Sequence, residues 1–258
     1  MNKQGNWEEA VNLFLTEWKK KKEVIGALVC GSYITGNPSE HSDIDLHIIL
    51  SNKTNWRERG NKFVNGFLIE YFANPPKQIK KYFDEDYKDN SYQSPIMFIT
   101  GKILFDKEGE IVKLKRIAQG IKNKKFPKLS KVPFELKKYS LWDNLDNLQD
   151  NYKKDRDDFY YIYYNYLKQI YETYAKYNQV SVINVDKTYS IFTDALTLMK
   201  YLEKEFPDRR FVSLFLKALK ITSKDIMLKN FEELLRYVFA SMNGFEVNGW
   251  KIRSPVDK

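Results

Sequence analysis

The sequence predicts an α+β protein in which a mixed β-sheet flanked by helices is followed by an all-α helical-bundle domain. Residues 24–30 and 44–50 are short apolar runs, which are typical of buried strands. After Pro133 the composition changes, because glycine disappears until Gly244 and apolar residues recur at helical spacing. With 258 residues the chain is long enough for two domains. We expect the first to span residues 1–122.

Apolar spacing places the elements of the first domain. Residues 7–22 are expected to form a helix whose apolar face packs against the sheet. The first strand stops at Gly31, and a short helix is expected to begin at Ser32. Residues 62–73 are expected to form one strand that carries Glu70.

The second domain is expected to span residues 133–258 and to consist of helices. One helix is expected over residues 187–205, where apolar side chains recur every three or four positions. Thr222 and Asp225 resemble a capping box that starts the last helix. Gly244 is expected to end that helix.

Composition indicates the kinds of partner and the compartment. The net charge of +9 favours polyanionic partners such as nucleotides or nucleic acid, without choosing among them. The single cysteine, Cys30, lies in an apolar run and is expected to be a small buried hydrophobe. One cysteine permits no disulfide within the chain, which suits a reducing cytoplasm. No run approaches the roughly 18 apolar residues of a membrane span. We therefore expect a cytoplasmic protein without a membrane partner; the oligomeric state stays open.

Three carboxylates are the first candidate functional groups. Asp43 and Asp45 are two positions apart at the start of an apolar strand, so they point to the same face. Like charges that close repel each other, and a divalent cation removes the repulsion. Mg²⁺ prefers a few carboxylates together with waters and substrate phosphates. Glu70 is the only acid in the apolar stretch 67–72.

The Gly31-Ser32 pair is the second candidate feature. A strand that ends at such a pair and turns into a helix presents backbone N–H groups, which bind phosphate oxygens. Glycine lets the backbone approach a ligand closely, and the Ser32 hydroxyl adds one donor.

In this order, these features resemble the signature of the DNA-polymerase-β-like nucleotidyltransferase superfamily. The signature reads Gly-Ser, ten residues, Asp-x-Asp between apolar neighbours, and then a third acid in an apolar strand. The segment 104–106, followed by Gly109 and a helix, is similar to the domain junction of the two-domain kanamycin and lincosamide nucleotidyltransferases. The resemblance is specific over residues 24–106 and general over the helical remainder.

The resemblance implies a Mg²⁺-dependent transferase that moves a nucleoside monophosphate from an NTP, with ATP the first choice, to an acceptor hydroxyl and releases pyrophosphate. Asp43 and Asp45 would hold two Mg²⁺ ions that bridge the triphosphate. Glu70 would complete the acceptor-side metal site or act as a base. The nucleotide-binding residues expected with them are Gly31, Ser32, Ser42 and Lys187.

A base from the second domain is also implied. In the aminoglycoside-modifying relatives, a carboxylate on the first helix of that domain takes this role. The corresponding helix offers Asp143, Asp146 and Asp150 on the face opposite its apolar stripe. Asp146 is the middle residue and is assigned as catalytic, although a solvated helix face would carry the same residues.

Two further features of the sequence concern contacts with an anionic ligand. Thr35 stands where many small members of the family have arginine, so one phosphate contact must come from elsewhere or NTP binding is weaker. The stretch 113–131 is rich in lysine and arginine and has no acid. It is either a solvated linker or the wall of a site for an anionic ligand.

The sequence leaves three classes of function open. A small molecule such as an antibiotic is one class of acceptor. A toxin–antitoxin-type or regulatory transferase would instead modify a protein or RNA, although the usual minimal members are much shorter. A non-catalytic module that binds nucleotide or nucleic acid is supported only by the basic charge, and the complete set of carboxylates argues against it.

Overall fold

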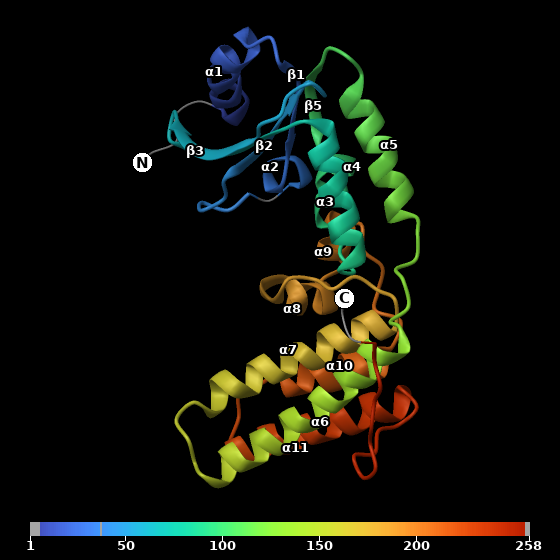
Figure 1. Ribbon diagram of the computed structural model, residues 1–258. Helices are drawn as coiled ribbons and strands as arrows, with labels where there is room; N and C mark the ends of the chain where they lie inside the picture. Colours follow the sequence, from blue (N-terminus) through green and yellow to red (C-terminus); the bar gives the residue numbers. More distant parts are fainter. Residues whose placement is uncertain (1–5, 37, 256–258) are drawn as a thin grey trace. The chain divides into compact units, whose positions relative to one another are not determined.

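A computed structural model describes residues 6–36 and 38–255 and divides the chain into two compact units, Met1–Lys124 and Lys125–Lys258. The first unit holds a five-stranded sheet with flanking helices, and the second unit is helical (Figure 1). The predicted α+β class is therefore confirmed.

The first unit is built on a mixed sheet with the strand order β3-β4-β2-β1-β5. Strands β2 and β4 are parallel, and the other neighbours are antiparallel. Its elements are α1 (Trp7–Lys20), β1 (Val24–Cys30), α2 (Ser32–Thr35), β2 (Ile44–Leu50), β3 (Glu58–Val64), β4 (Phe67–Asn74), α3 (Pro76–Lys88), α4 (Gln93–Thr100), β5 (Lys102–Asp106) and α5 (Glu110–Lys122). The strands predicted at residues 24–30 and 44–50 are confirmed. Every residue of β1 is buried, as its unbroken apolar run indicates.

Helix α1 covers one face of the sheet. Its N-cap is Asn6, whose side-chain oxygen accepts a hydrogen bond from the Glu9 amide at 2.8 Å. The rings of Phe14 and Trp18 lie 5.2 and 5.5 Å from the ring of Tyr71 on β4. The helix predicted over residues 7–22 is thus confirmed, with its end two residues earlier.

The opposite face of the sheet carries the carboxylates, and we call it the site face. Because side chains alternate along a strand, Glu70 and Phe72 point away from the face that Tyr71 occupies. Phe72 stacks on His47 of β2, with ring centroids 5.2 Å apart. His47 in turn contacts Phe98 of α4 at 5.0 Å. Asp45 lies two residues before His47 and therefore shares this face.

The single strand predicted over residues 62–73 is wrong, because this segment belongs to a hairpin. Strands β3 and β4 are joined at Asn65 and Gly66, which have φ values of 50° and 78°. Asn-Gly with positive φ at both positions is the favoured two-residue hairpin turn. Most of β3 is polar and exposed, as suits an edge strand, so it lacks the apolar pattern of a buried strand.

The second unit packs its helices around one apolar core. The core draws on α6, α7, α10 and α11, with Leu148, Tyr163, Phe211 and Leu234 among its buried side chains. The helices are α6 (Lys131–Lys153), α7 (Phe159–Tyr177), α8 (Val185–Thr193), α9 (Ala195–Lys200), α10 (Arg209–Ala218) and α11 (Lys224–Ser241). Across the part of the chain that the structure describes, no helix is both long and apolar enough to cross a membrane.

Two predictions about the second unit are corrected. The helix expected over residues 187–205 is two helices, α8 and α9, because the Asp194 carboxylate accepts the amides of Leu196 and Thr197 and so starts a new helix. Met199 on α9 is 64% exposed. The N-cap of α11 is Ser223 rather than Thr222, and no side-chain cap bond forms there.

Asp208 joins three helices of the second unit. As the N-cap of α10, it accepts the Phe211 amide at 2.9 Å. It also accepts the hydroxyl of Tyr174 from α7 at 2.5 Å and that of Tyr237 from α11 at 2.9 Å. Burial alone would raise the pKa of Asp208, but these hydrogen bonds outweigh it and the pKa lies below its usual value. The ionised carboxylate therefore contributes to the stability of the unit.

Candidate active site

Sheet pairing places two of the three predicted carboxylates, Asp45 and Glu70, side by side. Asp45 on β2 is in register with Glu70 on the parallel neighbour β4 and with Cys30 on β1. Adjacent strands lie about 4.8 Å apart, so Asp45 and Glu70 are direct neighbours on the site face. Asp43 precedes β2 and lies two residues before Asp45. The strand register thus accounts for the proximity of Asp45 and Glu70, whereas Asp43 lies before the paired residues.

The absence of a side chain at Gly31 leaves room for the Asp45 carboxylate. Its φ of 75° and ψ of −159° belong to a region that only glycine occupies readily. A Cβ at this position would lie 2.0 Å from Oδ2 of Asp45, where no atom fits. Glycine at position 31 therefore allows both the turn from β1 into α2 and the close approach of the carboxylate.

Helix α2 begins at Ser32, directly after that turn. Its four residues make a single helical turn, in which the Ile34 and Thr35 amides donate to the Gly31 carbonyl. The first amides of any helix lack a carbonyl partner within it, so they point toward the space before the helix. Ser32 is half-buried at this position.

Thr35 and Ser42 have local structural roles. The Thr35 hydroxyl donates to the Gly31 carbonyl at 3.1 Å, so this side chain stabilises its own turn. The Ser42 hydroxyl accepts the Ser39 amide at 2.8 Å and lies 3.1 Å from the Ser39 hydroxyl. Ser42 therefore stabilises the turn before β2, and its predicted nucleotide contact would be additional to this role.

Glu70 is held by an arginine that the sequence reading did not assign to the site. Nε and Nη2 of Arg59 donate to Oε1 of Glu70 at 3.1 and 2.5 Å. The Arg59 guanidinium also lies 4.8 Å from the centre of the Phe72 ring. Arg59 is on the edge strand β3, and its contact with Glu70 depends on the β3–β4 hairpin. Because that hairpin was not predicted, no pairing of Arg59 with Glu70 could be inferred.

His47 lies beside the carboxylates and was also not predicted to be part of the site. Among the described residues, neither of its ring nitrogens has a hydrogen-bond partner, and both nitrogens are shielded from solvent. Burial lowers the pKa of His47 to about 4, so the ring is neutral at pH 7. The sequence did offer an indication, because a residue two positions after Asp45 on a strand lies on the same face. It stacks on Phe72 and meets Phe98 edge-on, which gives it a packing role.

The donor set fits a hard divalent cation. Carboxylate oxygens are the ligands that Mg²⁺ prefers, and Asp45 and Glu70 supply them on the site face, with Asp43 two residues before Asp45. Within residues 6–36 and 38–255, no three His, Cys, Asp or Glu side chains are already gathered as a metal-binding group. Glu70 instead bonds to Arg59. Binding by all three carboxylates would therefore require Glu70 to exchange this partner for the metal.

Two predicted site residues, Asp146 and Lys187, belong to the second unit. Asp146 lies exposed on α6. Its neighbour Asp143 bonds to Asn147 on the same helix, and Asp150 bonds to Lys154, the C-cap of that helix, whereas the described residues include no partner for Asp146. Lys187 lies on α8, 3.7 Å from Asp186 and 5.5 Å from the centre of the Tyr201 ring. The roles of Asp146 and Lys187 stay predictions.

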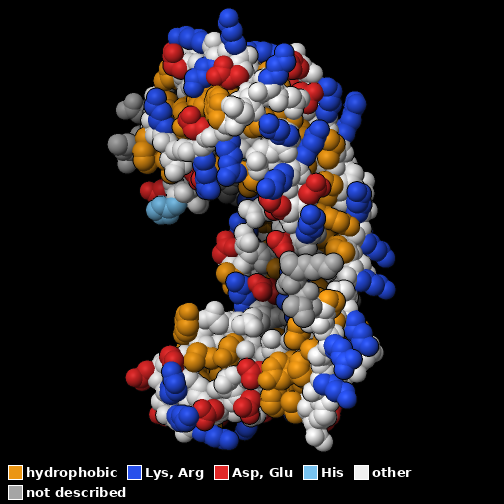
Figure 2. All heavy atoms as spheres, in the orientation of Figure 1, with side chains coloured by type: hydrophobic (Ala, Val, Ile, Leu, Met, Phe, Trp, Pro, Cys, Tyr) orange, Lys and Arg blue, Asp and Glu red, His pale blue; other side chains and the backbone are white. Residues whose placement is uncertain are grey.

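The basic stretch 113–131 is partly used within the first unit. Lys113 pairs with Glu110 at 2.6 Å, and the Lys115 ammonium donates to the Gly101 carbonyl at 2.7 Å. Figure 2 shows Lys and Arg side chains spread over the visible face of the molecule with Asp and Glu among them. These contacts favour the interpretation of the stretch as a solvated helix face and linker.

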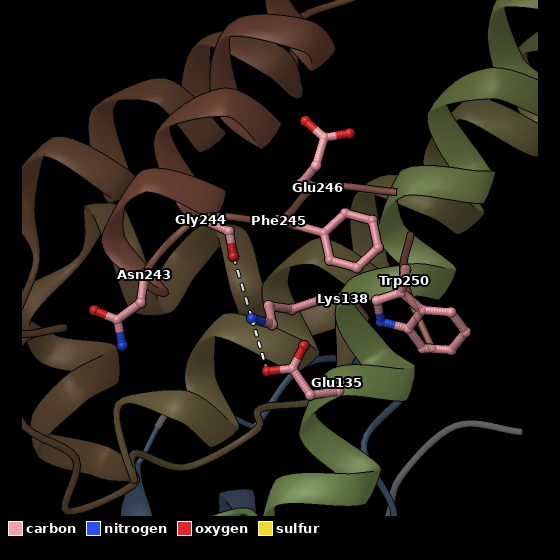
Figure 3. A pocket seen from close by; sticks show the side chains of 7 residues that line it. All are labelled: Glu135, Lys138, Asn243, Gly244, Phe245, Glu246 and Trp250. Atoms are coloured by element: carbon pink, nitrogen blue, oxygen red, sulfur yellow. Dashed lines mark hydrogen bonds and ion pairs between the residues drawn. The ribbon is translucent and has the colours of Figure 1, made fainter. Parts of the chain in front are cut away.

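A pocket of about 430 Å³ lies in the second unit, between α6 and the segment after α11 (Figure 3). The buried ammonium of Lys138 donates to the Gly244 carbonyl at 3.1 Å and pairs with Glu135 at 2.8 Å. Phe245 and Trp250 supply aromatic walls. Lys138 thus ties α6 to the turn that ends α11, which is a structural role.

Comparison with known families supports the expected superfamily. A family model described as polymerase beta, nucleotidyltransferase matches residues 15–65. This segment contains Gly31, Ser32, Asp43 and Asp45 and ends before Glu70. It is therefore similar to a nucleotidyltransferase domain over the Gly-Ser turn and the Asp-x-Asp strand.

A solved structure also resembles the chain. It is a nucleotidyltransferase-like protein from Exiguobacterium sibiricum 255-15, with 13% sequence identity and a TM-score of 0.47. The similarity covers 92% of this chain and 80% of the other. A comparison with curated proteins gives no match.

Proposed function

We propose that this protein is a Mg²⁺-dependent nucleotidyltransferase that transfers a nucleoside monophosphate, from ATP as the first choice, to an acceptor hydroxyl. The observation that carries the proposal is the register of Asp45 with Glu70, beside a turn that requires glycine at position 31. A pair of like charges on the site face has little structural use in an apolar sheet. It suits a metal-dependent reaction at phosphate.

The proposed roles follow the chemistry of phosphoryl transfer. Asp43, Asp45 and Glu70 would hold Mg²⁺, which supplies charge neutralisation and brings the attacking and leaving oxygens into line. The amides at the start of α2 and the Ser32 hydroxyl would orient the β- and γ-phosphates. The acceptor oxygen would form a bond to the α-phosphorus while the bond from that phosphorus to the bridging oxygen breaks. Pyrophosphate would leave with the electrons of the broken bond.

A base must receive the proton of the acceptor hydroxyl, because an alcohol is a weak nucleophile at neutral pH. Asp146 is the proposed base, with Glu70 as the alternative. The hydrogen bonds that Asp143 accepts from Asn147 and Asp150 accepts from Lys154 support Asp146 as the available carboxylate of the three.

The acceptor is proposed to be a small molecule such as an antibiotic. This part of the proposal rests on the resemblance of the two-domain plan to the kanamycin and lincosamide enzymes. An RNA or protein acceptor is the alternative, and the net charge of +9 favours RNA between these two.

The proposal is tested by incubating the protein with each labelled NTP, Mg²⁺ and panels of antibiotics, RNA and proteins. We expect label to move to one acceptor class and pyrophosphate to be released. Asp45→Asn should lower the rate by at least ~10²-fold with an unchanged melting temperature, because it removes one electrostatic element from the site. Equal transfer by Asp45→Asn and the unaltered protein would refute the proposed roles.

A further inference from the structure

We propose that Arg59 is a positioning residue that competes with the divalent cation for Glu70. Arg59 holds the third carboxylate on the β3 side, and binding of a cation by Glu70 would require its release. The inference rests on the proposed function, because it concerns the metal-binding carboxylates of that same site.

The first support is the position of Glu70 between two competing partners. On one side, β2 places Asp45 in register with it. On the other side, β3 places Asn61 opposite it and Arg59 diagonally across from it on the same face. The Glu70 side chain can therefore bond toward β3 or ligate a cation shared with Asp45.

The second support is the geometry of the arginine contact. Two donors of the Arg59 fork meet the same oxygen, Oε1 of Glu70, and the guanidinium plane is placed near the Phe72 ring. A planar fork of donors, which can meet a carboxylate while its plane lies near an aromatic ring, is a feature that arginine has and lysine lacks. The contact is therefore more specific than a chance pairing of surface charges.

The third support is electrostatic. Of the three acids Asp43, Asp45 and Glu70, the last two are side by side on neighbouring strands, and repulsion between like charges favours a positive partner there. Arg59 supplies one positive charge directly on the third of these acids. A divalent cation at the carboxylates would supply the same compensation, so the arginine and the metal are alternatives for Glu70.

The ion pair of Arg59 with Glu70 is weak enough for Glu70 to exchange the arginine for a cation. Its guanidinium side chain is 69% exposed, while the Glu70 side chain is 17% exposed. Exposed ion pairs contribute little, so the competition should weaken metal binding by only about two- to fivefold. An exposed partner can also swing away without disturbing the sheet core.

The test is a double-mutant cycle on metal affinity, measured by titrating Mn²⁺ alone into the protein. Arg59→Ala should bind Mn²⁺ about two- to fivefold more tightly than the unaltered protein. In a Glu70→Gln background, the same change should leave the affinity unaltered, because the contested carboxylate is gone. Melting temperatures confirm that each variant is folded.

Arg57→Ala is the matched control for general charge. Arg57 is an exposed arginine two residues earlier, and it donates to the Tyr82 hydroxyl at 2.7 Å rather than to Glu70. Its removal should alter Mn²⁺ affinity less than removal of Arg59. An equal gain in both variants, no gain for Arg59→Ala, or the same gain with and without Glu70 would overturn the inference and leave the proposed function standing.

Failure of the proposed function has a different signature. If the unaltered protein shows no saturable Mn²⁺ binding that Asp45→Asn weakens, then the metal centre itself is absent and both proposals fail. If that binding exists, the cycle reports on Arg59 alone.

Discussion

Replacement of Gly31 by alanine should separate the chemistry of the site from the stability of the fold. The added methyl group would begin 2.0 Å from Oδ2 of Asp45, and ordinary contact starts at 3.4 Å. The carboxylate must therefore move by about 1.4 Å, the difference between these two distances. A displacement of ~1 Å at reacting groups can lower a rate by ~10²-fold.

Gly36→Ala is the matched control for backbone strain. Gly36 has a φ of 85° and a ψ of 154°, so alanine is strained there as it is at position 31. No described atom lies within 4 Å of a Cβ built on Gly36. Both variants should lose about 1–3 kcal/mol of stability from the glycine-only backbone conformation.

Nucleotidyl transfer and thermal melting should then diverge between the two variants. We expect similar falls in melting temperature, with a ~10²-fold loss of transfer only for Gly31→Ala. Saturable Mn²⁺ binding should weaken in the same variant. Equal transfer rates for the two alanine variants would refute the reasoning, because the collision with Asp45 is the feature that distinguishes them.

Three further predictions address separate parts of the chain. Ser32→Ala should weaken nucleotide affinity by about 1–3 kcal/mol, the range for a hydrogen bond to a charged group; unchanged affinity in a titration would make the Gly-Ser turn purely structural. Asp146→Asn should lower kcat far more than it raises KM for NTP, whereas Asp150→Asn should retain its kcat; equal kcat values would assign the base to Glu70 instead. Since the pKa of Asp208 is lowered by folding, its contribution to stability is present above about pH 4, the unfolded value, and is lost as the pH falls through the folded value. The free energy of unfolding, measured by chemical denaturation across that pH range, should fall less for Asp208→Asn than for the unaltered protein.

The buried strands of the first unit were predictable because most of their side chains are buried on both faces of the sheet. Residues 24–30 and 44–50 are apolar runs between polar turns, and burial on both faces of a central strand calls for that pattern. The Gly-Ser turn and the order of the carboxylates were readable for a related reason. Asp43 and Asp45 interrupt an apolar pattern, and such an interruption stands out from sequence alone.

Strand β3 and the break after α8 were not predictable from apolar spacing, since other forces decide them. Strand β3 is held by its hairpin turn and by backbone pairing at the sheet edge, neither of which needs apolar side chains. The break at Asp194 comes from a carboxylate that caps a new helix inside a continuous helical pattern. Asn65-Gly66 was a visible hairpin signal, whereas the Asp194 cap competes with an uninterrupted apolar repeat.

The partners of site residues were the least predictable feature. Arg59 meets Glu70 across a hairpin, and His47 packs between two rings from different elements. Each of these contacts depends on tertiary structure rather than on spacing along the chain. The sequence therefore indicated which carboxylates share a face and left open what holds them there.

The contact of Lys138 with Gly244 has a consequence for biosynthesis. It joins residues 106 positions apart. The Lys138 ammonium on α6 therefore meets its acceptor, the Gly244 carbonyl, only after nearly the whole second unit has left the ribosome. Until then its ammonium stays hydrated and α6 has an incomplete core. The first unit has all its strands once residue 106 has emerged, and N-terminal domains generally fold first during synthesis. We expect a nascent chain stalled before Gly244 to carry a protease-resistant first unit and a protease-sensitive second unit.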